Sequence, residues 1–373
     1  MPTALISGAG IAGLTLAHWL RRHGFTPTVV ERAPAPRPGG QAIDIRGTAL
    51  TVVERMGLLE AARGARTRFA GQSVLDADGN EVERSTEMTY TGGWFNNDDI
   101  EIMRDDLAHL LHEKARDGVV YRFGDSVSAL TDTGSGVRVE FERGEPSTFD
   151  LVLGADGLHS TVRRLAFGEE HRFLRPMGAF AGIFSTENFL DLHDWQIWYM
   201  NLPEAAYGLY PTRDNTRLRV MMGFEDEPFD YDYRDTHAQK RILAHRFATM
   251  DWETPRLLKA MWDADDFFFD SMAQIRMDTW SSGRTALVGD AAHCPSPQSG
   301  QGSSLALVGA YILADELGRA PDDHRTAFAR YEERMRPFVE LNQELAFPDE
   351  SATTETENTA RVERVKSAID LDD

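Results

Sequence analysis

The stretch Ala4-Leu-Ile-Ser7-Gly8-Ala-Gly10-Ile11-Ala12-Gly13 decides the fold of this chain. Its four leading residues have the apolar character of a short buried strand, and the glycines after them predict a tight turn. The apolar periodicity that begins at Ile11 predicts a helix that ends at Gly24, and Thr28–Glu31 reads as the next strand. The result is a βαβ unit, the context that a Gly-x-Gly-x-x-Gly dinucleotide fingerprint requires.

The three glycines of this fingerprint have separate physical roles. Gly8 permits the tight turn, Gly10 lets the backbone approach a pyrophosphate, and Gly13 allows the helix to pack closely on the strand. The phosphates would lie at the helix N-terminus, beside Ile11 and Ala12, where free N–H groups favour anions.

A carboxylate ends the second strand of this unit. Glu31, followed by Arg32, can accept hydrogen bonds from ribose hydroxyls and would repel a 2′-phosphate, so the pocket suits FAD or NAD better than NADP. The alternative is a glycine turn with an edge glutamate and no ligand.

A second glycine loop lies far along the chain, in Gly289-Asp290-Ala-Ala-His293-Cys294-Pro295 and Ser299-Gly300-Gln-Gly302. We expect Asp290 to accept a hydrogen bond from the ribityl chain of a flavin, although it could instead cap the following turn. Gly300 and Gly302 would allow the backbone to approach the flavin ring at the start of a helix, and Pro297 would stiffen this wall. Two such loops in one chain indicate a flavin.

Three further motifs extend this pattern. They are Arg104-Asp-Asp-Leu107, Gly154-Ala-Asp156-Gly157-Leu-His-Ser160-Thr-Val162-Arg163 and Gly40-Gln-Ala-Ile-Asp44-Ile-Arg46-Gly47. With them the chain resembles the group A (class A) FAD-dependent aromatic monooxygenases, the para-hydroxybenzoate hydroxylase-like family, and more closely its tetracycline-inactivating branch. The motifs occur in the family's order from residue 1 to about residue 318. The chain departs from the family at Val308-Gly309-Ala310, where many members have an acidic residue.

The resemblance implies roles for several charged residues. Arg104 would contact the FAD, unless it is only the first-turn residue of an exposed helix. Asp44 would contact the FAD as well, unless it merely makes a turn. Asp156 would shape its own loop and contribute to the cleft for FAD and nicotinamide. Arg163 is expected to be a solvated helix residue or part of a structural ion pair.

No catalytic side chain and no metal ligand are assigned. Cys294 is the only cysteine, so a cysteine metal cluster or a disulfide within the chain is excluded, and His293 is expected to be a structural loop residue. A single cysteine also favours a reducing cytoplasm.

The charge of the chain excludes other partners. With 39 Lys and Arg against 60 Asp and Glu, the formal net charge is −21, which disfavours nucleic acids and anionic membranes. The apolar run 305–314 is too short to span a bilayer. We expect a cytoplasmic monomer or weak homo-oligomer.

The predicted fold is α/β: a Rossmann-type, GR2-like FAD-binding domain with an inserted β-sheet and helix substrate domain and a C-terminal helix. Residues 1–69, 97–171 and 276–347 would bind FAD, residues 70–96 and 172–275 would cover the substrate, and 348–373 would form a linker and a helix over 360–369. The tryptophans at 94, 195, 198, 252, 262 and 280 suggest, as a group, a pocket for something flat and large.

The activity that the resemblance implies is hydroxylation of a polycyclic phenolic or enolic molecule of the polyketide or antibiotic type. NADPH or NADH would bind transiently and reduce the FAD, which would react with O2 to a C4a-hydroperoxide that transfers one oxygen atom. The alternatives are another flavoenzyme on the same fold, such as an oxidase, a reductase or a halogenase, and a non-catalytic flavoprotein that sequesters a ligand. The Trp-x-Trp-x-Ile-Pro segment of the halogenases is absent.

Overall fold

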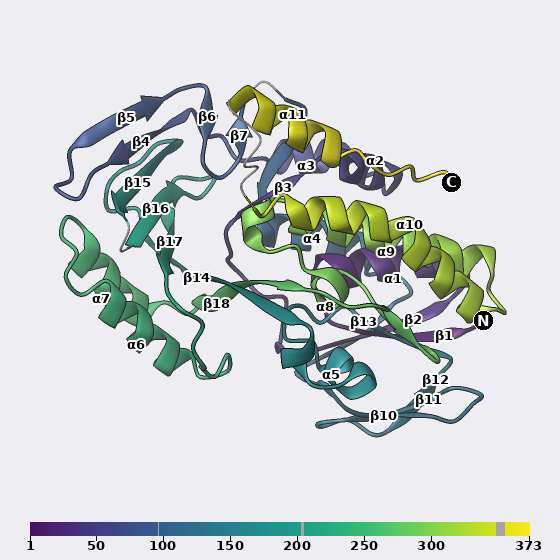
Figure 1. Cartoon of the computed structure of the whole chain (residues 1–373). Coiled ribbons are helices and arrows are strands. Elements are labelled where there is room, and N and C mark those ends of the chain that lie inside the picture. The colour runs from purple at the N-terminus through teal and green to yellow at the C-terminus, as the bar shows by residue number, and fades with distance from the viewer. Residues whose placement is uncertain (96, 203–204, 348–354) are drawn as a thin grey trace.

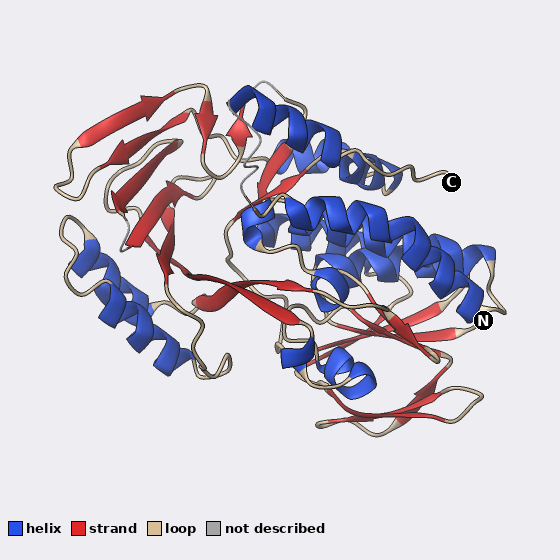
Figure 2. Cartoon of the chain, in the orientation of Figure 1, coloured by secondary structure: helices blue, strands red, loops and turns tan. Residues whose placement is uncertain are grey.

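The computed structural model describes residues 1–95, 97–202, 205–347 and 355–373. The chain forms two lobes, and the strands β14 and β18 run between them (Figures 1 and 2). The predicted linker falls largely within 348–354, outside the described residues. None of the helices in the described ranges combines the length and the apolar composition that a membrane crossing needs.

The first lobe is built on a six-stranded sheet that is parallel except at one edge. In order across the sheet, its strands are β19 (Ser281–Ser282), β20 (Thr285–Leu287), β13 (Leu151–Gly154), β1 (Thr3–Ser7), β2 (Thr26–Glu31) and β9 (Val120–Phe123). Strand β1 is central and pairs Ile6 with Val29 on one side and with Leu153 on the other. The predicted βαβ unit is therefore confirmed.

Helices cover one side of this sheet, and a small antiparallel sheet with one helix covers the other (Figure 1). The helices of this lobe are α1 (Ile11–Arg22), α2 (Thr48–Arg55), α3 (Leu59–Ala65), α4 (Arg104–Ala115), α5 (Thr161–Phe167), α8 (Asp290–His293), α9 (Gly302–Arg319) and α10 (His324–Glu344). The smaller sheets are β10 (Val127–Asp132), β11 (Val137–Phe141) and β12 (Ser147–Phe149), and the pair β3 (Ala42–Ile45) and β8 (Ile100–Met103). Two 3₁₀ turns, η1 (Glu170–Arg172) and η2 (Pro297–Ser299), complete the lobe.

The second lobe is a seven-stranded sheet with helices on one face. Its strands are, in order, β18 (Phe268–Ile275), β14 (Leu174–Glu187), β17 (Arg217–Glu225), β16 (Ala205–Pro211), β15 (Trp195–Asn201), β4 (Gly71–Leu75) and β5 (Glu81–Ser85), and the hairpin β6 (Met88–Thr89) and β7 (Gly93–Trp94) lies beside them. The helices are α6 (Thr236–Arg246) and α7 (Thr254–Asp263). Because β4 pairs in parallel with β15, residues 70–96 and 172–275 contribute strands to one sheet, and the domain boundaries stay a prediction.

Side-chain alternation gives this second sheet two different faces. One face packs with α6 and α7 in an apolar core that includes Phe184, Tyr199, Tyr207 and Phe224. The other face, which we call the cleft face, carries Ser185, Gln196, Trp198, Tyr210 and Arg219. Its side chains reach the first lobe, since the Tyr210 hydroxyl accepts a hydrogen bond from the backbone of Ala42 and Arg219 pairs with Asp105.

The C-terminal helix was predicted over 360–369, and this range is wrong. The observed helix α11 spans Glu355–Val365. It ends there because the residue that follows is tied to the first lobe: the carbonyl of Lys366 accepts a hydrogen bond from the backbone of Thr48, and its ammonium group contacts Asp99 at 3.0 Å. Tertiary contacts thus override the local helical periodicity.

Candidate functional site

The glycines of the first loop differ in whether the surrounding protein leaves space for a side chain. A Cβ atom at Gly8 would lie 2.4 Å from the carbonyl oxygen of Ala155, and one at Gly13 would lie 2.0 Å from the carbonyl oxygen of Gly8. A Cβ at Gly10 would meet nothing within 4 Å. Gly8 and Gly13 are therefore required by packing, whereas the open space at Gly10 fits the approach of a ligand.

The second glycine loop repeats this arrangement. A Cβ at Gly289 would lie 2.9 Å from the Cβ of Ala12 on α1, so this glycine lets the two loops come together. A Cβ at Gly302, the first residue of α9, would meet nothing within 4 Å. The side chain of Gln301 is fully buried, yet neither polar atom of its amide has a hydrogen-bond partner.

Helices α1 and α9 pack against each other, and neither has a side chain that caps its first turn. Their N-terminal N–H groups are thus available to an anionic or polar ligand. Two open glycine positions and an unsatisfied buried amide fit a flavin dinucleotide at this place.

Glu31 lies at the end of β2, where its carboxylate is already oriented by the backbone. One oxygen accepts a hydrogen bond from the N–H of Ala9 and the other from the N–H of Ala33, both at 2.8 Å. This holds the carboxylate against the glycine loop. Arg32 is exposed beside it. Contacts of Glu31 and Arg32 with a cofactor stay predictions.

The two aspartates of the loop motifs, Asp156 and Asp290, differ in how many hydrogen bonds they accept from the protein. Asp156 accepts hydrogen bonds from the hydroxyls of Ser7 and Ser160 and from the backbone of Val162, so it shapes its own loop, as predicted. Asp290 lies beside Cys294, whose thiol donates to the carbonyl of Ala273 at 3.5 Å, and burial raises the pKa of Asp290 to about 6. A carboxyl with so little support from the protein is a good candidate for binding a ligand.

We expect Asp290→Ala to weaken FAD binding by about 5- to 150-fold. This corresponds to the loss of one charge-assisted hydrogen bond, about 1–3 kcal/mol. Fluorescence titration of the FAD-free protein with FAD measures the change, and unfolding by urea shows whether the fold is kept. If the affinity is unchanged, Asp290 does not belong to the site.

Arg104 is not an exposed helix residue, so that alternative is wrong. Its guanidinium donates hydrogen bonds to the carbonyl oxygens of Gly39 (2.7 Å) and Arg37 (2.9 Å), while the N–H of Gly39 is bound by Asp105. Burial lowers the pKa of Arg104. Arg104 therefore fixes the loop 37–40, and its direct contact with FAD stays a prediction.

Asp44 does not make a turn either, since it is buried within strand β3. Its carboxylate pairs with Arg46 at 2.7 Å. A Cβ at Gly300 would lie 3.4 Å from the Nη1 atom of Arg46, so this arginine lies against the second glycine loop.

Arg163 and His293 are structural. Arg163 is fully buried, so its interpretation as a solvated residue is wrong and that as an ion pair is confirmed: it contacts Glu170 at 2.7 Å and the carbonyl of Ala291 at 3.0 Å. His293 is buried against Trp280 and bonds the hydroxyl of Tyr331. Trp280 thus belongs to the core of the first lobe and to no substrate pocket.

The aromatic residues divide between the two faces of the second sheet. Trp198 lies on the cleft face, where its ring covers Gly208 and Tyr90 contacts it edge-on at 5.3 Å. Trp252 stacks on Tyr199 and Tyr207 on the opposite face, and Trp262 is exposed. Only part of the tryptophan group can therefore meet a substrate.

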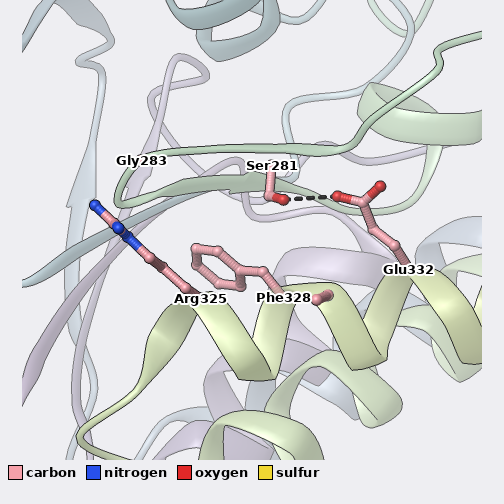
Figure 3. A pocket seen from close by; sticks show the side chains of 6 residues that line it. Ser281, Gly283, Arg325, Phe328 and Glu332 are labelled. Carbon is pink, nitrogen blue, oxygen red and sulfur yellow. Dashed lines mark hydrogen bonds between the residues drawn. The ribbon is translucent and has the colours of Figure 1, made fainter.

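A surface pocket of about 460 Å³ lies elsewhere, between the β19–β20 hairpin and α10 (Figure 3). Ser281, Arg325, Phe328 and Glu332 line it, and the hydroxyl of Ser281 donates to Glu332 at 2.6 Å. None of the glycine-loop residues takes part in it, and we assign it no role.

Sequence reasoning missed three residues at this site: Arg46, Glu101 and Gln301. Arg46 and Gln301 are part of recognised motifs, but their residue types do not indicate that the guanidinium lies against Gly300 or that the amide is buried without a partner. Glu101 lies on β8, directly opposite Asp44 on β3. The sequence of neither strand indicates that the two strands pair or that their carboxylates lie opposite each other.

Comparisons with known proteins agree with this geometry. The family described as FAD binding domain matches residues 1–345. An uncharacterized protein of Mycobacterium tuberculosis (strain H37Rv) is 53% identical over 92% of each chain, and a flavin-dependent monooxygenase of an unknown prokaryotic organism is 40% identical over 91% of this chain and 87% of its own. The crystal structure of tetracycline destructase Tet(51) has a TM-score of 0.89 at 35% identity and covers 99% of each chain.

Proposed function

The chain belongs to the FAD-binding class A monooxygenases, and on this premise we propose that it hydroxylates a polycyclic phenol or enol with NADPH or NADH as transient electron donor. The observation that carries the proposal is the cleft face, which meets the first lobe at β3, next to the second glycine loop. It carries the aromatic ring of Trp198 and the polar groups of Gln196 and Tyr210, which are buried and hydrogen-bonded to neighbouring residues. Such a surface suits a large ring system with hydroxyl groups.

The residues that would hold FAD are those of the two glycine loops. Gly10 and the N-terminus of α1 would receive the pyrophosphate, Glu31 the ribose, Asp290 the ribityl chain, and Gly300 and Gly302 the ring. FAD held there would supply the redox chemistry, namely acceptance of a hydride and activation of O2. The protein's own part is to orient the substrate beside Gly300 and to exclude water from the cleft.

The likeness to a tetracycline destructase supports a polycyclic enol as the substrate class. Tetracycline itself is thus the first compound to test. The alternative functions would give different experimental results. An oxidase would consume O2 without inserting it into the product, and a sequestering protein would return its ligand unchanged.

Replacement of Trp198 by alanine should raise KM about tenfold, equivalent to ~1.4 kcal/mol, or divert reduced flavin to hydrogen peroxide. The ring lies on the cleft face and touches none of the glycine loops, so FAD should stay bound. Steady-state kinetics with a peroxide assay measure both effects.

Trp252→Ala is the matched control, because Trp252 stacks on the opposite face of the same sheet. It should lower stability and leave KM unchanged. Equal KM values together with equal peroxide release for the wild type and Trp198→Ala would remove Trp198 from the substrate site.

A further inference from the structure

A buried cluster of five charged side chains lies where β3 and β8 pair beneath the cleft face. Its members are Asp44, Arg46, Asp99, Glu101 and Lys366. Arg46 contacts Asp44 at 2.7 Å, and Asp99 contacts Lys366 at 3.0 Å and approaches Arg46 at 3.9 Å. The side chains of Asp44, Asp99 and Lys366 are each less than a tenth exposed.

Two carboxylate oxygens of this cluster have no partner. They are the buried Oδ1 of Asp44 and the buried Oε1 of Glu101. Asp44 and Glu101 are directly opposite each other in the antiparallel ladder, so their side chains extend from the same face. A single proton held by the two carboxyl groups would remove the repulsion between them, as like-charged carboxylates in one site require.

The charges of the cluster balance only with such a proton. Three acids stand against two bases, so the fully ionised cluster would carry one uncompensated negative charge in a buried place. With one proton on the Asp44 and Glu101 pair, the sum is zero. Glu363 also contacts Lys366, but its side chain is about half exposed and faces solvent.

The surroundings of Asp44 and Glu101 favour the protonated form of these carboxyl groups. Burial, reinforced by Glu101 and Asp99 and opposed by Arg46, raises the pKa of Asp44 to about 7. Burial also raises the pKa of Glu101. Tyr210 faces the same region, and burial raises its pKa well above the usual range, so it stays protonated.

The cluster reaches the cleft from two sides. Nη1 of Arg46 lies against Gly300 of the second glycine loop. On the other side, the hydroxyl of Thr67 donates to Oε2 of Glu101 at 2.6 Å, and the nearby Thr91 accepts a hydrogen bond from Gln196 on the cleft face at 2.5 Å. A ligand between the glycine loop and the cleft face would thus lie next to this cluster.

We propose that Asp44 and Glu101 share one proton and that the pair, when both carboxylates are ionised, takes this proton from the substrate's phenol or enol hydroxyl. The O–H bond of the substrate breaks, its electron pair stays on the substrate oxygen, and the proton forms a new O–H bond on one carboxylate of the pair. The charge of the cluster passes from minus one to zero, and Arg46, which lies against Gly300, faces the oxyanion. The acceptor role rests on the proposed function, whereas the shared proton does not.

Infrared difference spectroscopy of the FAD-saturated protein between pH 5 and pH 9 tests the shared proton. The wild type should show the C=O stretch of a protonated carboxyl that disappears with a midpoint near pH 7. Asp44→Asn and Glu101→Gln should each lack this band, and either variant suffices if the other does not fold. Glu363→Gln, the control, should keep it. Asp290, whose pKa burial raises to about 6, contributes a band of its own in every variant. Absence from the wild type of a component with a midpoint near pH 7, or its persistence in both variants, overturns the proposal.

The acceptor role is tested by the pH dependence of kcat, with the substrate that the oxygen-labelling experiment described below identifies. Loss of a positioned base should lower kcat by about 100-fold or more below the pKa of the substrate hydroxyl. The loss should shrink above that pKa, where the hydroxyl ionises in solution. A loss of the same size at every pH would assign the pair a purely structural role. If no substrate is hydroxylated, the proposed function fails while the infrared result still decides the shared proton.

Discussion

Gly10→Val should yield a folded protein that no longer holds FAD. The backbone of Gly10 has φ −82° and ψ −172°, which any residue can adopt, and a Cβ there meets no protein atom within 4 Å. The added side chain would instead occupy the space that we assign to the pyrophosphate. We expect at least a ~100-fold loss of affinity, about 2.7 kcal/mol, with little change in the stability of the FAD-free protein.

Gly13→Val is the matched control for this experiment. Its Cβ would lie 2.0 Å from the carbonyl oxygen of Gly8, so the βαβ unit itself should fail to form. Circular dichroism and FAD titration on both variants separate the two roles. A folded Gly10→Val protein with the affinity of the wild type would place the pyrophosphate elsewhere.

Arg163→Ala should lower the free energy of unfolding by about 3 kcal/mol. The guanidinium is fully buried and bonds two carbonyl oxygens besides Glu170, so its removal leaves several acceptors without a donor. We place the effect at the low end for a buried pair because Glu170 is about a third exposed and can be partly hydrated.

The neighbouring Arg164 on the same helix is exposed and provides the control. Arg164→Ala should change stability by less than about 0.5 kcal/mol. Urea denaturation at saturating FAD measures both variants. Equal stabilities for the two would show that the Arg163 and Glu170 pair contributes nothing to the fold.

The parts of the fold that the sequence predicted are those with local signals. The glycine spacing from Gly8 to Gly13, the apolar period of α1 and the strand before Glu31 all lie within one βαβ unit. Likewise, the turn at Ala77–Asn80 joins β4 to β5 as expected, because its residue types favour a tight turn.

Long-range pairing could not be predicted in the same way. Nothing in residues 71–75 indicates that they pair with residues 195–199, or that Glu101 faces Asp44. Trp198 and Tyr199 are adjacent on one strand and therefore point to opposite faces, but only the packing of α6 and α7 shows which face is the core. The end of α11 depends in the same way on the contacts of Lys366 with the first lobe.

The central claim is that one oxygen atom passes from O2 into an organic substrate. Mass spectrometry of tetracycline and a panel of polycyclic phenols, incubated with the enzyme, NADPH or NADH and isotopically heavy O2 in ordinary water, tests it directly. We predict a product that carries one heavy oxygen atom for each nicotinamide oxidised. Nicotinamide oxidation that yields only hydrogen peroxide across the panel, or product oxygen that comes from water, would contradict the account.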